Sequence, residues 1–100
     1  MPFKVLLAPS ALESLERLKA DRSQAKRFKA SSKALRLLEA NPDYPGLNTH
    51  AMQGVKCAHG STLFVSYAEN KTPGAYRIFW CYDPQNRGVI FVASIEPHPD

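Results

Sequence analysis

Several features that mark particular classes of protein are missing from this sequence. It has only two cysteines in 100 residues. Cys57 and Cys81 could in principle pair, but we expect both to be free thiols, because a cytosolic chain of this size keeps its thiols reduced. No apolar run is long enough to cross a membrane, and the apolar segment 3–7 is far too short for the hydrophobic region of a signal peptide. We therefore expect a cytoplasmic protein without a membrane partner.

The chain also lacks internal repeats, low-complexity tracts and any glycine-rich phosphate loop. Without such a loop, nothing indicates a nucleotide-binding enzyme. What is present is a hydrophobic content of 44% in a chain of 100 residues, enough to bury a core without metals or disulfides. We expect a single domain over residues 1–100.

Acidic residues are absent from one stretch of the chain. The segment 22–36 holds six basic residues and no acid, in a chain of formal net charge +4. Such an excess of positive charge attracts a phosphate-bearing partner or an acidic protein over a long range. The charge therefore points to a class of partner and says nothing of the fold.

The first half of the chain has the pattern of a short strand followed by two helices. The strand is predicted at 3–7. Ser10 and Glu13 are spaced as a reciprocal capping box at the start of the first helix. The second helix is predicted over 24–40, and Asn41-Pro42 ends it because proline disfavours helix at the residue before it.

The second half has the pattern of an antiparallel sheet. Residues 41–60 are rich in Pro, Gly, Asn and His, which is typical of a long irregular connection. Three strand-like runs follow, separated by segments of turn composition. They are 62–67, 76–82 and 89–95. The expected fold is α+β: a strand and two antiparallel N-terminal helices packed on an antiparallel sheet whose last three strands form a C-terminal meander.

Two surfaces stand out in this arrangement. One face of the second helix carries Phe28 and Leu38, and the opposite face is basic. Both faces of the last strands are apolar, so both need cover. Two helices can shield only one face of the sheet, which leaves the other for a partner. We interpret the basic face as a contact with nucleic acid or the ribosome, and a solvated outer face is the alternative. The residues of the basic face that we expect to make this contact are Lys26, Lys29, Lys33 and Arg36.

Several segments resemble the RelE/ParE superfamily of bacterial toxins. Ala75–Tyr82 is similar to the "yRi-y" third strand of that superfamily. The segment 26–38, followed by Asn41-Pro42, resembles its second helix. Thr49–Gly54 resembles the "-H-L-G" segment that leads into its second strand. Together with the order of the elements, the resemblance covers nearly the whole chain.

The resemblance implies a toxin that cleaves messenger RNA on the ribosome without a metal or cofactor. Its partners would be the ribosome, the messenger RNA and a cognate antitoxin protein, and a homodimer is left open. The other branch of the superfamily inhibits DNA gyrase without chemistry, and a degenerate member would only bind a partner protein. The fold alone does not choose between these functions.

Cleavage of RNA by its own 2′-hydroxyl needs an acid, a base and positive charge near the phosphate. By position in the superfamily, Arg77 would lie beside the scissile phosphate, while His98 and His50 would be the acid–base groups. Each also has a structural alternative. Arg77 could pair with Glu69 or Glu96, His98 could belong to an exposed tail, and His50 could simply bond to backbone.

Two further groups of side chains were considered. Tyr67 and Tyr82 could stack on an unpaired base, although aromatic residues in strands more often belong to the core. Cys57 and His59, with Cys81 or His50, could supply soft metal ligands. Their spacing matches no standard zinc pattern, so no metal site is expected.

Overall fold

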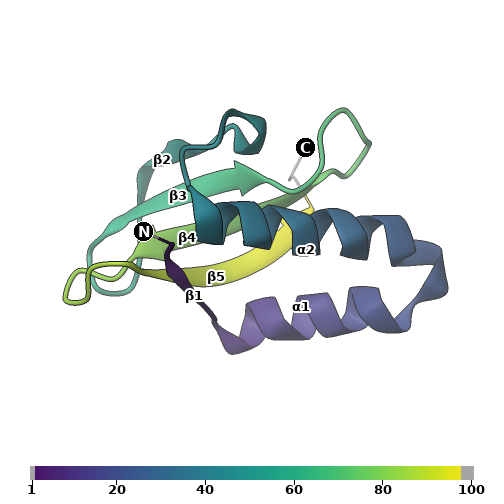
Figure 1. Cartoon of the computed structure of the whole chain (residues 1–100), viewed down its shortest axis with the longest axis horizontal. Coiled ribbons are helices and arrows are strands. Elements are labelled where there is room, and N and C mark those ends of the chain that lie inside the picture. The colour runs from purple at the N-terminus through teal and green to yellow at the C-terminus, as the bar shows by residue number, and fades with distance from the viewer. Residues whose placement is uncertain (1, 98–100) are drawn as a thin grey trace.

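A computed structural model describes residues 2–97 of the chain. It is an α+β fold in which two helices pack on one face of a five-stranded sheet (Figure 1). In chain order the elements are β1 (Lys4–Leu7), α1 (Pro9–Ala20), the 3-10 turn η1 (Arg22–Gln24), α2 (Ala25–Ala40), the 3-10 turn η2 (Pro45–Leu47), β2 (His50–Lys56), β3 (Thr62–Tyr67), β4 (Tyr76–Tyr82) and β5 (Val89–Pro97).

The sheet is mixed, and in this the prediction of an antiparallel sheet was wrong. Its strand order is β1-β5-β4-β3-β2. β1 pairs in parallel with β5, while the other neighbours are antiparallel. The two helices between β1 and the rest of the sheet supply the long connection that a parallel pair requires.

A strand in the segment 41–60 was also missed. β2 begins at His50 and pairs with β3, but the register shifts between Ala51 and Lys56. Gly54 lies within this interruption with a φ of 73°, a conformation that glycine adopts without steric cost. The bulge breaks the two-residue alternation that would otherwise have identified the strand.

The first helix begins differently from the prediction. Pro9 occupies its first turn, and the N-cap is Ala8, whose side chain makes no capping hydrogen bond. The capping box of Ser10 and Glu13 was therefore wrong. Proline has no N–H to satisfy and its φ is already helical, so it can open the helix without a side-chain cap.

The core lies between the helices and one face of the sheet. Ala11 of α1 and Leu38 of α2 are fully buried against Ile78 and Trp80 of the central strand β4 and against its neighbour β5. Side chains alternate along a strand, so Arg77, Phe79 and Cys81 lie on the opposite face, which neither helix covers (Figure 1). Within residues 2–97, neither helix has the length and hydropathy needed to span a membrane.

The two cysteines form a disulfide, which corrects the expectation of free thiols. Cys57 follows β2, and Cys81 lies on β4 with its side chain on the uncovered face. The bond fastens the turn between β2 and β3 onto this face, where the ring centres of His59 and Phe91 are 6.2 Å apart. The pairing was weighed from the sequence and set aside, because the two cysteines come together only in the folded sheet.

Candidate functional site

Three side chains from three adjacent strands meet on the uncovered face of the sheet. His50 opens β2, Tyr67 ends β3, and Arg77 lies on β4 directly opposite Tyr67 in the register. We call His50, Tyr67 and Arg77 the sheet-face cluster. The structure thus brings together two of the three predicted catalytic residues. The third, His98, lies outside the described residues.

Arg77 carries the charge of the cluster. Its side chain is only 8% exposed. Nη1 donates hydrogen bonds to the carbonyl oxygens of Glu69, at 2.7 Å, and Tyr76, at 3.3 Å. The guanidinium carbon lies 3.7 Å from the centre of the Tyr67 ring. The buried Nε has no hydrogen-bond partner within the described part of the chain.

The structural alternative for Arg77 was an ion pair with Glu69 or Glu96. Glu69 pairs instead with Arg27, at 2.7 Å, and the Arg27 guanidinium lies 4.8 Å from the centre of the Tyr76 ring. Glu96 is opposite Arg77 on β5 and exposed. Among residues 2–97 no carboxylate forms an ion pair with Arg77.

His50 is held in one orientation by the backbone that precedes it. Asn48 follows η2 in the left-handed conformation, with a φ of 48°, which asparagine tolerates better than most residues. Its carbonyl oxygen is 3.0 Å from Nδ1 of His50. A carbonyl can only accept, so we assign the proton of neutral His50 to Nδ1, which leaves the lone pair on Nε2. His50 therefore makes the expected hydrogen bond to the backbone, and its Nε2 can still accept a proton.

Tyr67 lies between the two polar members of the cluster. Its ring makes an edge contact with the His50 ring, at 6.1 Å between centres and 77° between planes. It also stacks on Arg77. This arrangement follows from the register, which puts Tyr67 opposite Arg77 and the neighbouring Val65 opposite His50.

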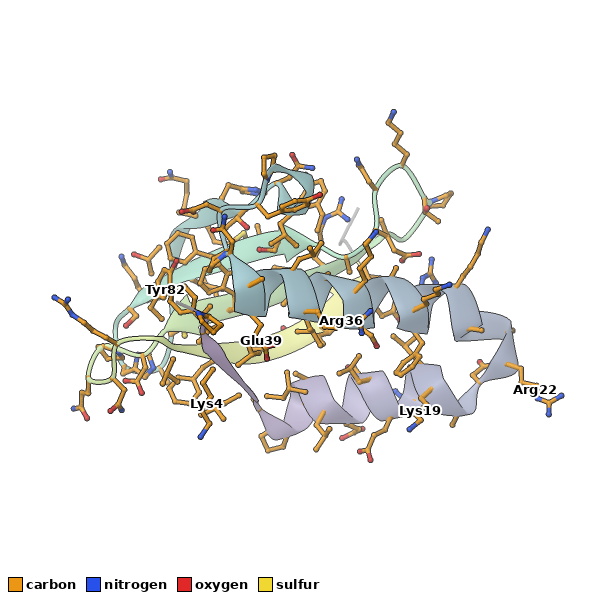
Figure 2. The ribbon with its side chains drawn as sticks, in the orientation of Figure 1. Lys4, Lys19, Arg22, Arg36, Glu39 and Tyr82 are labelled. Carbon is orange, nitrogen blue, oxygen red and sulfur yellow. A yellow bond between two sulfur atoms is a disulfide. The ribbon has the colours of Figure 1, made fainter. Side chains whose placement is uncertain are left out.

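The basic face of α2 is separate from the cluster. The four residues predicted to bind RNA or the ribosome are all exposed on the solvent side of the helix. Arg22 projects away from the molecule at the turn between the helices, and Arg36 lies further along α2 (Figure 2). This basic face thus belongs to the helical layer, whereas the sheet-face cluster lies on the other side of the sheet. Its members are Lys26, Lys29, Lys33 and Arg36.

One pocket is lined by a residue from each of the two regions. A cavity of about 350 Å³ lies between α2 and η2. Lys33 of the basic face and Tyr67 of the cluster both line it, together with Tyr44 and Gly46. We call it the α2–η2 pocket. Sequence reasoning missed Tyr44, although an aromatic residue before Pro45-Gly46 in a polar segment is a usable signal.

Tyr82, the other candidate for stacking, lies on the helix side of the sheet (Figure 2). Its ring packs against Phe3, Phe64 and Trp80, with centres 4.9 to 5.8 Å apart. Burial, with a smaller contribution from the charge of Asp43, raises the pKa of Tyr82 above its ordinary value. Tyr67 and Tyr82 therefore lie on opposite faces of the sheet.

The residues considered for metal binding are arranged differently from a metal site. Cys57 and Cys81 are bonded to each other. Within residues 2–97, no group of three or more His, Cys, Asp or Glu side chains is placed to hold a metal ion. The disulfide instead forms part of a hollow of about 460 Å³, with Leu63, Phe91 and His59 as neighbours.

Comparison with other proteins adds no family to these observations. No protein-family model matches the chain, and searches of curated proteins and of solved structures find no match either.

Proposed function

We propose that this chain is a RelE/ParE-like toxin, a metal-independent endoribonuclease that cleaves messenger RNA on the ribosome. The arrangement of the elements supports this proposal: a first strand, two helices, and a sheet whose last three strands form a meander. The observation that carries it is the Arg77 guanidinium. Within residues 2–97 this residue keeps a buried positive charge without a paired carboxylate. It lies on the sheet face that the helices leave uncovered, where Tyr67 contacts both Arg77 and His50.

The energetics of Arg77 favour an anionic ligand. Burying a guanidinium costs several kcal/mol, which a paired carboxylate usually offsets. Here two backbone carbonyls and the Tyr67 ring stabilise the charge without neutralising it. A phosphate that enters beside Tyr67 would supply the missing negative charge and accept hydrogen bonds from the guanidinium.

The neutral ring of His50, with its proton on Nδ1, is the tautomer that the first chemical step needs. In the proposed reaction, Nε2 of His50 takes the proton of the 2′-hydroxyl, the 2′-oxygen attacks phosphorus, and the bond from phosphorus to the 5′-oxygen breaks. Arg77 would stabilise the charge that grows on the phosphate oxygens. The leaving 5′-oxygen needs a proton, and we assign this role to His98.

The remaining parts of the proposal concern partners. The exposed basic face of α2 would hold ribosomal or messenger phosphates, and the attraction would weaken with salt. A cognate antitoxin protein would bind the toxin and suppress it. A protein that acts within translating ribosomes would work in the cytoplasm.

The test is induced expression in a bacterial host, with growth followed while new 5′ ends of cellular messenger RNA are mapped. We expect growth arrest and new ends inside coding regions. His50→Gln should abolish the new ends and relieve the arrest, because the base is lost. His59→Gln is the matched control, since His59 is an exposed histidine outside the cluster, and it should behave as the parent protein. Arrest with intact messages would refute the ribonuclease proposal.

One observation favours a second candidate without chemistry. Arg77 is 8% exposed, a burial that suits a structural residue of a protein-binding inhibitor such as the gyrase-directed branch. In that case the same experiment would give growth arrest and DNA damage with unbroken messages. Unhindered growth would indicate a member that only binds a partner protein.

A further inference from the structure

We propose that the α2–η2 pocket binds one unstacked nucleobase of the RNA, with Tyr44 as the stacking surface and Lys33 as the contact for the adjoining phosphate. This inference rests on the proposed function and adds to it a subsite that would set the sequence preference of cleavage. The pocket has a volume of about 350 Å³, within the range of small-ligand sites.

Tyr44 presents an aromatic surface to solvent at the mouth of this pocket. The residue is 46% exposed, although buried neighbours such as Leu47 lie in the same turn. Bases of single-stranded RNA stack on exposed aromatic rings because every base has a π-face. An exposed ring beside a cavity is therefore a stacking platform.

Gly46 sets the position of the Tyr44 ring. A Cβ at Gly46 would lie 2.7 Å from Cε2 of that ring, so the ring packs directly over the glycine. Any side chain at this position would require the ring to move. The ring is held along the pocket wall although its outer side is open to solvent.

Lys33 supplies charge complementarity at the same site. It is exposed, belongs to the basic face of α2 and lines the pocket. The ion pairs found within residues 2–97 involve Arg17 and Arg27, so no carboxylate competes for the Lys33 ammonium there. A nucleotide that stacks on Tyr44 would bring its phosphate within reach of this lysine.

Tyr67 connects the pocket with the sheet-face cluster, because it lines the one and belongs to the other. The pocket itself is lined by α2, on the helix side of the sheet. In this proposal, an RNA strand bound at Arg77 passes around the end of β3 at Tyr67 and places one base in the pocket.

The first measurement is the binding of short single-stranded RNA oligonucleotides of different sequence to the full chain by fluorescence anisotropy. Tyr44→Ala should weaken binding about tenfold or more, the range expected for the loss of one base–aromatic stack, while Tyr44→Phe should bind as the parent protein. Equal binding by Tyr44→Ala and the parent would overturn the pocket and leave the ribonuclease proposal intact.

The variant Gly46→Ala tests whether RNA binding can be lost without loss of stability. The added methyl group meets only the far end of an exposed side chain, so the melting temperature should hardly change while binding falls as it does in Tyr44→Ala. Lys33→Met should also weaken binding more than Lys29→Met, a matched loss of charge from the same helix outside the pocket. An equal loss of RNA binding in the two lysine variants would mean that Lys33 contributes only general electrostatic attraction. That result would overturn its proposed contact with the phosphate at the pocket.

The outcomes for the two proposals differ. RNA binding that depends on Tyr44, without new 5′ ends on induced expression, would support the pocket and overturn the ribonuclease proposal. New 5′ ends whose sequence context is the same in Gly46→Ala as in the parent would overturn the pocket alone. A parent protein that neither binds nor cleaves RNA overturns both.

Discussion

The relay of hydrogen bonds around Ser66 gives a quantitative test of how the segment before β2 is held. Trp80 Nε1 donates to Ser66 Oγ at 2.8 Å, and Ser66 Oγ lies 2.6 Å from Thr49 Oγ1. Thr49 Oγ1 in turn donates to the carbonyl oxygen of Pro42 at 3.0 Å. Since the single hydroxyl proton of Thr49 goes to Pro42, Ser66 must donate to Thr49.

Ser66→Ala breaks this relay at its centre. Ser66 is 0% and Trp80 1% exposed, so water cannot replace the lost partner. Two hydrogen bonds are lost, each with a net contribution of about 1 kcal/mol, and the buried indole N–H is left unpaired at a further cost. We expect a loss of about 3 kcal/mol in the free energy of unfolding, which lowers the melting temperature by about 12–24 °C.

A double-mutant cycle isolates the unpaired N–H. In a Trp80→Phe background there is no indole proton to leave unpaired, so Ser66→Ala should cost only about 1 kcal/mol. The coupling energy is then about 2 kcal/mol. Urea unfolding followed by far-ultraviolet circular dichroism is the suitable assay, because Trp80 is the only tryptophan. Additivity within about 0.5 kcal/mol would refute the relay.

Three further outcomes follow from other parts of the structure. Leu38→Ala should lower the free energy of unfolding by about 2–5 kcal/mol, because Leu38 is 0% exposed. Leu12→Ala, at a position 47% exposed, should change it by less than about 0.5 kcal/mol in the same urea titration. The raised pKa of Tyr82 means that the unfolded chain loses its phenol proton first. Stability should thus be complete below about pH 10 and fall as pH rises through the folded-state pKa, and Tyr82→Phe should flatten that decline. Denatured without reductant, the chain should show no free thiol to a thiol reagent and two after reduction, because Cys57 and Cys81 are joined. Closure of a loop of this length predicts that reduction costs about 3 kcal/mol of stability, and two reactive thiols before reduction would contradict the bond.

The parts of the fold that local pattern determines were predicted well. Strands β3 and β4 have the bounds expected at 62–67 and 76–82, because β-branched and aromatic residues alternate there between turn segments. The second helix also ends at Ala40 as expected, before Asn41-Pro42. Each of these signals acts over a few neighbouring residues.

The parts that depend on distant residues were not predicted. The parallel pairing of β1 with β5 joins positions 4 and 89, and nothing local distinguishes parallel from antiparallel pairing in so short a strand. The disulfide has the same origin, since Cys57 and Cys81 meet only across the finished sheet. β2 was missed for a local reason, because a bulge at Gly54 interrupts its alternation.

In the candidate site, too, some features could be predicted from the sequence and others depend on residues far apart in the chain. Arg77 and His50 were chosen by resemblance to a superfamily, and the structure places both beside Tyr67 on one face of the sheet. That Arg77 would be buried without a carboxylate partner in the described part of the chain could not be predicted, because its neighbours are distant in the sequence. The role of Arg27 as the partner of Glu69 was hidden for a similar reason.

The position of β5 between the first strand and the rest of the sheet has a consequence for how the chain reaches its native state. β5 lies between β1 and β4, so the first strand has no partner until residues 89–97 are available. Pairing of the two ends of a chain requires a large loop to close, which slows folding. During synthesis, the helices and the hairpin of β3 and β4 can form early, but β1 and β4 can be joined only when the last strand has left the ribosome. Premature termination before residue 89 should therefore leave two unconnected pieces of sheet rather than a shortened version of the fold.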